Sequence, residues 1–159
     1  MSVSITQSAK ETQKLAAKLA QNCRGGEVFC LSGELGAGKT TFVQGFAKAL
    51  GIAAAITSPT FVLEKIYPIR THSTVTRLVH VDAYRIGTDA TPPLDLTDHL
   101  NDPHTIVLIE WPDHLSSLLQ NVEYNNVTFR VVDPGEREIE IKEYYGQWRV
   151  AAGKRSHRA

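Results

Sequence analysis

The sequence predicts an α/β fold in which a mixed, mainly parallel central sheet lies between helices and carries a C-terminal antiparallel hairpin. Short apolar runs at 28–31 and 105–109 have the length and composition of strands that are buried on both faces. Apolar residues recur at helical spacing on both sides of the first run. Residues 127–131 and 139–141 alternate between apolar and polar side chains around Asp133-Pro134-Gly135, which indicates the hairpin.

The chain as a whole has the size and composition of one globular domain. It has 159 residues, of which 42% are hydrophobic and 21% are charged. We expect a single domain over residues 1–148 and a basic tail at 149–159, for which a frayed terminus is favoured over an RNA-binding arm. Cys23 and Cys30 are expected to be reduced thiols, because Cys30 lies in an apolar strand and the pair forms no metal-binding pattern.

The charge and hydropathy patterns favour neither a membrane nor DNA as a partner. Seventeen basic residues balance seventeen acidic ones, so any anion site must be local. The apolar runs fall far short of the roughly 20 residues that a membrane-spanning helix needs. Residues 1–5 also lack the pattern of a secretory signal. We therefore expect a cytoplasmic protein.

The first helix is predicted to begin at Ser8 and to end before Gly25-Gly26. Ser8 and Glu11 have the spacing of a capping box. The apolar residues that recur on one face of this helix are Leu15, Ala16, Leu19 and Ala20. The strand at 28–31 follows, then a glycine-rich turn, and then a second amphipathic helix that stops at Gly51.

The middle of the chain is predicted to alternate between connections and regular elements. We expect, in order, an irregular connection at 52–59, an extended segment at 61–67, an exposed loop at 70–76, a strand at 78–86, a weak helix at 94–100 and a strand at 105–109. Along the strand at 78–86, His80, Asp82 and Tyr84 share one face because side chains alternate. The strand at 105–109 delivers Glu110 at its carboxyl end, where ligands of open α/β sheets bind.

A glycine-rich loop lies between the strand at 28–31 and the second helix. Residues 33–40, Gly-Glu-Leu-Gly-Ala-Gly-Lys-Thr, satisfy the G-x-x-x-x-G-K-[ST] phosphate-binding pattern. Its glycines permit positive φ angles and a close approach of backbone N–H groups to phosphate, and the helix that follows adds positive potential. The sequence therefore predicts a three-layer P-loop NTPase domain over residues 1–148, with ATP and Mg²⁺ as cofactors.

The loop also assigns individual roles. Lys39 is expected to reach the β- and γ-phosphates, and the Thr40 hydroxyl is expected to bind magnesium. The loop residues predicted to contact the nucleotide are Glu34, Leu35, Gly36, Ala37, Gly38, Lys39, Thr40 and Thr41. GTP is disfavoured, because the sequence contains no Asn-Lys-x-Asp motif.

Two carboxylates are candidates for the chemistry of hydrolysis. Glu110 stands where a Walker-B acid is expected, although Asp is more usual there. For Asp82 three roles are open: it holds a metal-bound water, it orients the hydrolytic water, or it is a strand carboxylate capped by nearby donors. With Lys39 these residues form the predicted catalytic set. His80 is interpreted as structural, and Arg85 either stabilises charge on the transferred phosphate or makes a surface ion pair.

Two further features each have two interpretations. Residues 57–61, Thr-Ser-Pro-Thr-Phe, place three hydroxyls in a proline-pinned loop, which is either a nucleotide-sensing switch or a plain turn. Trp111, directly after Glu110, packs either near the nucleotide or a partner, or in the ordinary core.

Four blocks of the sequence, taken in order, resemble the TsaE (YjeE) family of small bacterial P-loop ATPases. They are residues 33–41, residues 57–61, His80-Val81-Asp82-Ala83-Tyr84-Arg85 and Ile109-Glu110-Trp111-Pro112. The resemblance covers about residues 5–145. It implies a Mg²⁺-dependent ATPase of tRNA threonylcarbamoyladenosine (t6A) biosynthesis, slow without its partners.

The resemblance further implies that such a protein acts with TsaB and TsaD. Together they form the threonylcarbamoyl group on N6 of adenosine 37 in tRNAs that read codons beginning with adenine, and tRNA is met only indirectly, through the complex. Carried onto this sequence, the family pattern makes Thr40 and Glu110 the magnesium residues. It makes Lys39 the phosphate lysine and Asp82 a residue needed for hydrolysis.

The family pattern also makes residues 57–60 the switch, with Thr60 among the nucleotide-binding residues. Two stretches depart from the family. Residues 87–96 stand where an acidic stretch leading into a Leu-Gly-Leu-Glu-like segment is expected, and the stretch at 71–76 is longer than usual. These departures concern partner-facing loops rather than the nucleotide site.

Two other functions stay open on the residues alone. A small-molecule or nucleoside kinase would share the phosphate-binding loop and the chain length, although the sequence has no evident arginine-rich lid. A non-catalytic, nucleotide-dependent binding module would use Asp82 and Glu110 only to structure the site.

Overall fold

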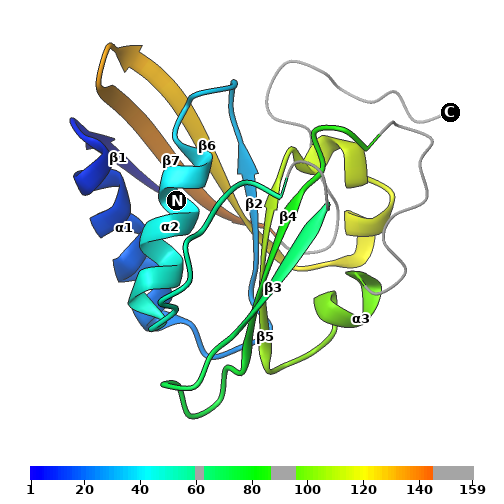
Figure 1. The fold of residues 1–159 in the computed structure, drawn as a ribbon. Helices are drawn as coiled ribbons and strands as arrows, with labels where there is room; N and C mark the ends of the chain where they lie inside the picture. Colours follow the sequence, from blue (N-terminus) through cyan, green and yellow to red (C-terminus); the bar gives the residue numbers. More distant parts are fainter. Residues whose placement is uncertain (60–62, 87–95, 145–159) are drawn as a thin grey trace, which may run out of the picture.

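A seven-stranded sheet forms the centre of the molecule in the computed structural model, which describes residues 1–59, 63–86 and 96–144 (Figure 1). Its strands are β1 (Ser2–Thr6), β2 (Val28–Ser32), β3 (Glu64–Pro68), β4 (Arg77–Asp82), β5 (Thr105–Glu110), β6 (Tyr124–Asp133) and β7 (Glu136–Tyr144). They are arranged in the order β1-β7-β6-β2-β5-β4-β3. The neighbouring strands β6, β2, β5 and β4 run parallel, whereas β7, β1 and β3 are antiparallel to their neighbours.

Helices cover both faces of this sheet. The α-helices are α1 (Ala9–Asn22), α2 (Lys39–Ala49) and α3 (Leu96–Leu100), and the 3₁₀ helices are η1 (Pro112–Leu115) and η2 (Leu118–Asn121). Figure 1 shows α1 and α2 on one face and α3 on the other. The predicted three-layer α/β fold with a parallel centre and a C-terminal hairpin, β6–β7, is thus confirmed.

Each face of the sheet packs its own apolar cluster. Under α1 and α2, Phe42 and Phe46 of α2 meet Phe29 and Phe129 of the sheet, with ring centroids of Phe42 and Phe129 5.5 Å apart. On the opposite face, valines of β2, β4 and β5 and Ile109 pack beneath leucines of α3 and the 3₁₀ helices. Burial of apolar surface on both sides explains why β2 and β5 are continuous apolar runs.

The first helix begins where the capping residues predict. The Ser8 Oγ accepts a hydrogen bond from the Glu11 amide at 3.2 Å, and Glu11 Oε2 accepts one from the Gln7 amide at 2.7 Å. These contacts satisfy N–H groups at the start of α1 that have no partner within the helix. No helix in the described part of the chain is long and apolar enough to cross a membrane.

Three details differ from the sequence prediction. β1 was not expected. The strand predicted at 78–86 ends at Asp82, because Asp82 Oδ1 accepts the Tyr84 amide and turns the chain out of the sheet. In the loop at 70–76, Val75 is fully buried, although most of its neighbours are exposed. Both cysteines are free, as expected.

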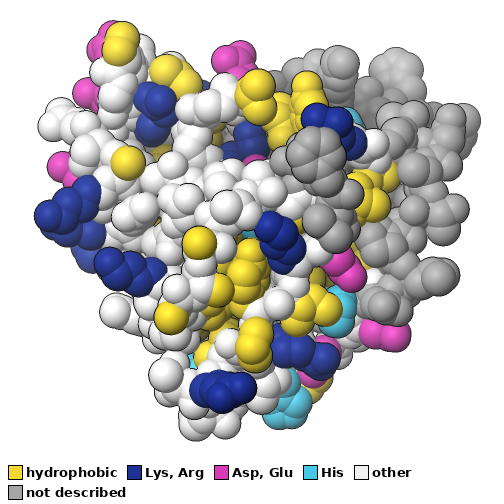
Figure 2. Space-filling view, in the orientation of Figure 1, with side chains coloured by type: hydrophobic (Ala, Val, Ile, Leu, Met, Phe, Trp, Pro, Cys, Tyr) yellow, Lys and Arg dark blue, Asp and Glu magenta, His cyan; other side chains and the backbone are white. Residues whose placement is uncertain are grey.

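The charged side chains on the face seen in Figure 2 do not form one continuous patch of a single sign. Lys and Arg side chains lie at several separate points of this face, with apolar and acidic side chains between them. This distribution agrees with the balanced charge of the sequence.

Candidate active site

The carboxyl ends of three neighbouring strands bring the predicted carboxylates together. β2 pairs with β5 and β5 with β4, so that Leu31 stands beside Glu110 and Glu110 beside Asp82. Leu78 is on the same side of β4 as Asp82, and Leu108 is on the same side of β5 as Glu110, because side chains alternate along a strand. Both leucines pack in the apolar cluster under α1 and α2. The two carboxylates therefore lie on the face of the sheet that α2 covers.

The loop between β2 and α2 needs glycine for two different reasons. Gly36 and Gly38 have φ angles of 78° and 107°, which side chains disfavour, although a Cβ at either residue would meet no atom within 4 Å. At Gly33, where φ is 155°, space adds a second reason, because a Cβ would lie 2.8 Å from the carbonyl oxygen of Phe129 on β6. The loop thus has the backbone that the phosphate-binding pattern predicts.

Lys39, the first residue of α2, folds back over this loop. Its Nζ donates to the carbonyl oxygens of Gly33 at 2.7 Å and Glu34 at 2.9 Å, and it lies 4.2 Å from the centroid of the Trp111 ring. Burial lowers the pKa of Lys39, while the charges of Glu110 and Asp82 act in the opposite direction. The ammonium group therefore lies within the loop, where the negative charges of Glu110 and Asp82 act on it.

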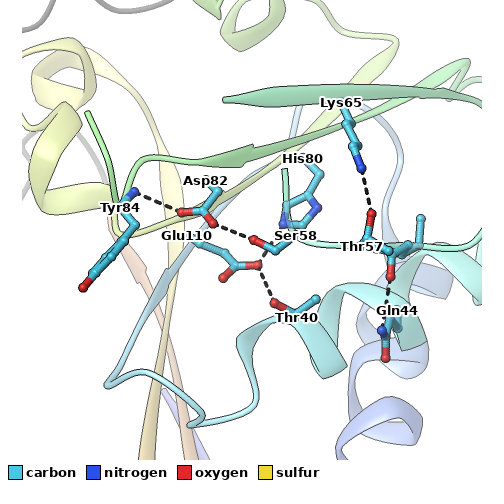
Figure 3. A network of polar contacts seen from close by, with 10 residues as sticks. Thr40, Gln44, Thr57, Ser58, Lys65, His80, Asp82, Tyr84 and Glu110 are labelled. Carbon is cyan, nitrogen blue, oxygen red and sulfur yellow. Dashed lines mark hydrogen bonds and ion pairs between the residues drawn. The ribbon is translucent and has the colours of Figure 1, made fainter. Parts of the chain in front are cut away.

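Glu110 accepts contacts from two other elements at a single oxygen. The Thr40 hydroxyl of α2 donates to Glu110 Oε1 at 3.1 Å, and His80 Nε2 of β4 lies 2.8 Å from the same atom (Figure 3). The side chains of His80 and Glu110 are 0% and 4% exposed. The contact of His80 with Glu110 was not predicted from the sequence, because it joins two strands whose adjacency no local pattern encodes.

Asp82 is held by the loop that follows α2. Ser58 Oγ donates to Asp82 Oδ2 at 2.6 Å, and the Tyr84 amide donates to Asp82 Oδ1 at 3.0 Å. One residue earlier, Thr57 Oγ1 accepts from Lys65 Nζ of β3 at 2.7 Å (Figure 3). The start of the hydroxyl-rich loop therefore reaches the site, whereas Thr60 lies outside the described residues.

A cleft of 440 Å³ opens between these groups. Of the predicted loop residues it is lined by Leu35, Gly36, Gly38, Lys39, Thr40 and Thr41. Asp82 and Glu110 line it from the strand ends, together with Tyr84, Arg85 and Trp111. Two predicted loop residues do not: Ala37 is buried in the core, and Glu34 contacts Lys39 through its carbonyl oxygen.

Trp111 lies between the cleft and the apolar core. Its ring contacts the Lys39 ammonium and lies 4.9 Å from the Tyr84 ring, measured between centroids. It also packs against the apolar cluster on the α3 face of the sheet. The residue has a φ of 59°, in the left-handed region, so the backbone at the end of β5 is strained where the cleft begins.

The chemistry of the cleft suits a small hard cation. Thr40 and Glu110 offer a hydroxyl and a carboxylate, the oxygen ligands that Mg²⁺ prefers. Among the described residues no group of three or more His, Cys, Asp or Glu side chains forms a metal site of its own. A magnesium ion that binds with a nucleotide does not need one, because phosphate and water supply most of its ligands.

A family model described as "Threonylcarbamoyl adenosine biosynthesis protein TsaE" matches residues 6–139. The chain belongs to the TsaE family. Proteins named "tRNA threonylcarbamoyladenosine biosynthesis protein TsaE" are similar to it in several organisms. The one from Aquifex aeolicus is 35% identical over 86% of this chain and 92% of its own length.

Two more TsaE-family proteins and one solved structure extend the comparison. The Bacillus subtilis protein is 37% identical over 84% of this chain and 80% of its own length. The Streptomyces coelicolor protein is 44% identical over 62% of this chain and 66% of its own length. The crystal structure of YdiB from Bacillus subtilis superposes with a TM-score of 0.70 at 30% identity, covering 87% of this chain and 82% of YdiB.

Proposed function

We propose that this TsaE-family chain is a Mg²⁺-dependent ATPase that supports t6A formation on tRNA. The observation that carries the proposal is the meeting of Lys39, Thr40 and Glu110 at the head of α2, beside a glycine-turned loop and a second carboxylate, Asp82. A lysine that can bind phosphate, and a hydroxyl and a carboxylate that can bind magnesium, are the groups that a nucleoside triphosphate with its Mg²⁺ ion requires.

In this proposal each residue has a distinct task. Backbone N–H groups of residues 34–41 and the Lys39 ammonium bind the phosphates. The Thr40 hydroxyl and the Glu110 carboxylate would hold Mg²⁺. The bound ion would neutralise negative charge on the phosphate oxygens. Asp82 faces the same cleft and orients the water that attacks. Ser58, which fixes one oxygen of Asp82, links this task to the hydroxyl-rich loop.

We propose that the chain acts in the cytoplasm with the partners TsaB and TsaD. It would contact tRNA only indirectly, through the complex that these proteins form. The names of the similar proteins from Aquifex aeolicus and Bacillus subtilis support a role in t6A biosynthesis.

The proposal is tested by phosphate release from Mg-ATP by the purified protein, alone and with TsaB and TsaD. We expect slow release that accelerates when both partners are added. Glu110→Ala should abolish the acceleration, because the magnesium-side carboxylate is lost. Rapid phosphate transfer to a small-molecule or nucleoside acceptor, without an effect of the partners, would instead identify a kinase.

A further inference from the structure

His80 occupies a position where an apolar residue is the rule. β4 is buried from Leu78 to Asp82, and the His80 side chain is fully buried. Its Nε2 contacts Glu110 Oε1, while its Nδ1 has no hydrogen-bond partner among the described residues. A buried polar atom without a partner weakens the fold. Packing alone therefore does not explain a histidine at this point.

The contact with Glu110 fixes which nitrogen of His80 carries the proton. A neutral imidazole has one N–H, and a carboxylate oxygen accepts it best, so the hydrogen lies on Nε2. His80 Nε2 therefore donates to Glu110 Oε1.

Two donors then converge on one oxygen of the carboxylate. His80 reaches Glu110 Oε1 from β4, and Thr40 reaches it from α2 (Figure 3). Within the described residues Glu110 Oε2 takes no hydrogen bond, and it belongs to a side chain that lines the cleft. The carboxylate is thus anchored through Oε1, which leaves Oε2 for a ligand in the cleft.

We propose that His80 is a positioning residue, which orients the Glu110 carboxylate toward magnesium. This inference rests on the proposed function, because it assigns the setting of that same magnesium site. In the proposed site the Thr40 hydroxyl serves both the ion and Glu110, whereas His80 Nε2 serves Glu110 alone. His80 lies in the rigid strand β4 and fixes the carboxylate independently of the ligand.

The test compares variants that keep or remove the donor at the position of Nε2. The amide nitrogen of Gln is the same number of bonds from Cα as His Nε2, whereas that of Asn corresponds to Nδ1. His80→Gln therefore keeps the donor, and His80→Asn and His80→Leu remove it. His99 provides matched controls, His99→Gln and His99→Leu, because it is a second buried histidine, with one ring nitrogen, Nε2, that has no hydrogen-bond partner among the described residues, but it lies on α3.

The measured quantity is the dissociation constant of a slowly hydrolysed ATP analogue, by calorimetry, in EDTA and in Mg²⁺. The ratio of the two constants reports the contribution of the ion without any reaction. We expect His80→Leu and His80→Asn to reduce this ratio by about tenfold, the usual effect of removing a group that orients a metal ligand. His80→Gln should restore most of it, and both His99 variants should match the wild type.

A double-mutant cycle separates positioning from general destabilisation. In a Glu110→Gln background, His80→Leu should cause no further loss of the magnesium effect, because its target is already removed. A full additional loss there would overturn the inference. A wild-type ratio of the two dissociation constants in His80→Asn would also overturn the inference. If His80→Leu does not fold, the comparison of His80→Asn with His80→Gln provides the test. If the wild type itself binds the analogue equally well in EDTA and Mg²⁺, the proposed function fails as well.

Discussion

Ser58 donates a 2.6 Å hydrogen bond to Asp82 Oδ2, which ties the loop after α2 to the carboxylate at the end of β4. The second oxygen of Asp82 accepts the Tyr84 amide at 3.0 Å. Both oxygens are thus oriented by the chain itself, and the loop and the carboxylate cannot move independently. Hydrolysis and the conformation of this loop should therefore be coupled.

Asp82→Asn should lower the rate of ATP hydrolysis by on the order of a hundredfold, the usual contribution of a group that orients or deprotonates water. Nucleotide affinity should stay close to that of the wild type, because the phosphate-binding loop is untouched. Phosphate release and calorimetry measure the two effects. Ser58→Ala should reduce the rate less than Asp82→Asn, since it removes one of two contacts of Asp82. Equal rates in wild type and Asp82→Asn would exclude Asp82 from the chemistry.

Lys39→Ala should weaken ATP binding by about one to two decades, because a charge-assisted contact is worth about 1.5–3 kcal/mol. Calorimetric titration with an ATP analogue measures the change. Lys48→Ala is the matched control, since Lys48 lies on the same helix but is exposed and does not line the cleft. Wild-type affinity in Lys39→Ala would contradict the assignment of this lysine.

Nucleotide binding should change the fluorescence of Trp111. The Lys39 ammonium lies 4.2 Å from its ring centroid, and it should leave the ring when it turns to the phosphates. The chain has two tryptophans, so Trp148→Phe leaves Trp111 as the single probe. The change should be absent when Lys39→Ala is added to that background. A spectrum that stays constant while calorimetry records binding would mean that Lys39 keeps its place over the ring.

Gly45→Ala should destabilise the protein, although alanine is the better helix former. A Cβ at Gly45 would lie 2.4 Å from the Cα of Gln13, so α1 and α2 could not keep their present distance. Overpacking of this kind costs typically about 1–3 kcal/mol. Urea unfolding should show a lower midpoint, whereas Lys48→Ala on the exposed side of α2 should not. A midpoint at or above that of the wild type would show that the helices separate without cost.

Acid should remove a stabilising contribution of Asp102. The Thr105 hydroxyl and the His104 amide, followed by Arg77, lower the pKa of Asp102 from 3.8 to about 2. A carboxyl whose pKa falls on folding stabilises the fold above the unfolded pKa and loses this effect as the pH falls through the folded one. Asp102→Asn should therefore be less stable than the wild type near neutral pH. The difference in unfolding free energy should shrink between pH 3.8 and about 2.

Asp133→Asn is the control for this pH series, because Asp133 is exposed at the β6–β7 turn. Its unfolding free energy should follow that of the wild type over the same range. A constant difference between Asp102→Asn and the wild type from neutral pH to pH 2 would show that the Asp102 charge does not contribute.

The parts of the site that were predictable from the sequence are those with local requirements. Gly36 and Gly38 need positive φ angles, and Lys39 and Thr40 follow directly at the start of the helix, so eight consecutive residues specify the loop. Glu110 was also predictable, because an apolar strand of this length ends at it.

The parts that were not predictable depend on which strands are neighbours. The contact of His80 with Glu110 joins residues 30 apart in the sequence, and it exists only because β4 lies beside β5. β1 was missed for a related reason. Its residues are mostly exposed, and its pairing with β7 at the other end of the chain, rather than a buried apolar run, defines it as a strand.

Asp82 and Glu110 lie side by side because the register of the parallel strands β4 and β5 pairs these two residues. A slip of one residue would turn His80 and Asp82 to the other side of the sheet and bring Val79 and Val81, both fully buried, into the polar cleft. Such a slip would lose the apolar packing of those valines. The hydrophobic effect therefore maintains the register that places the two acids side by side, and substitutions of buried apolar residues in β4 should disturb the site without changing a charged group.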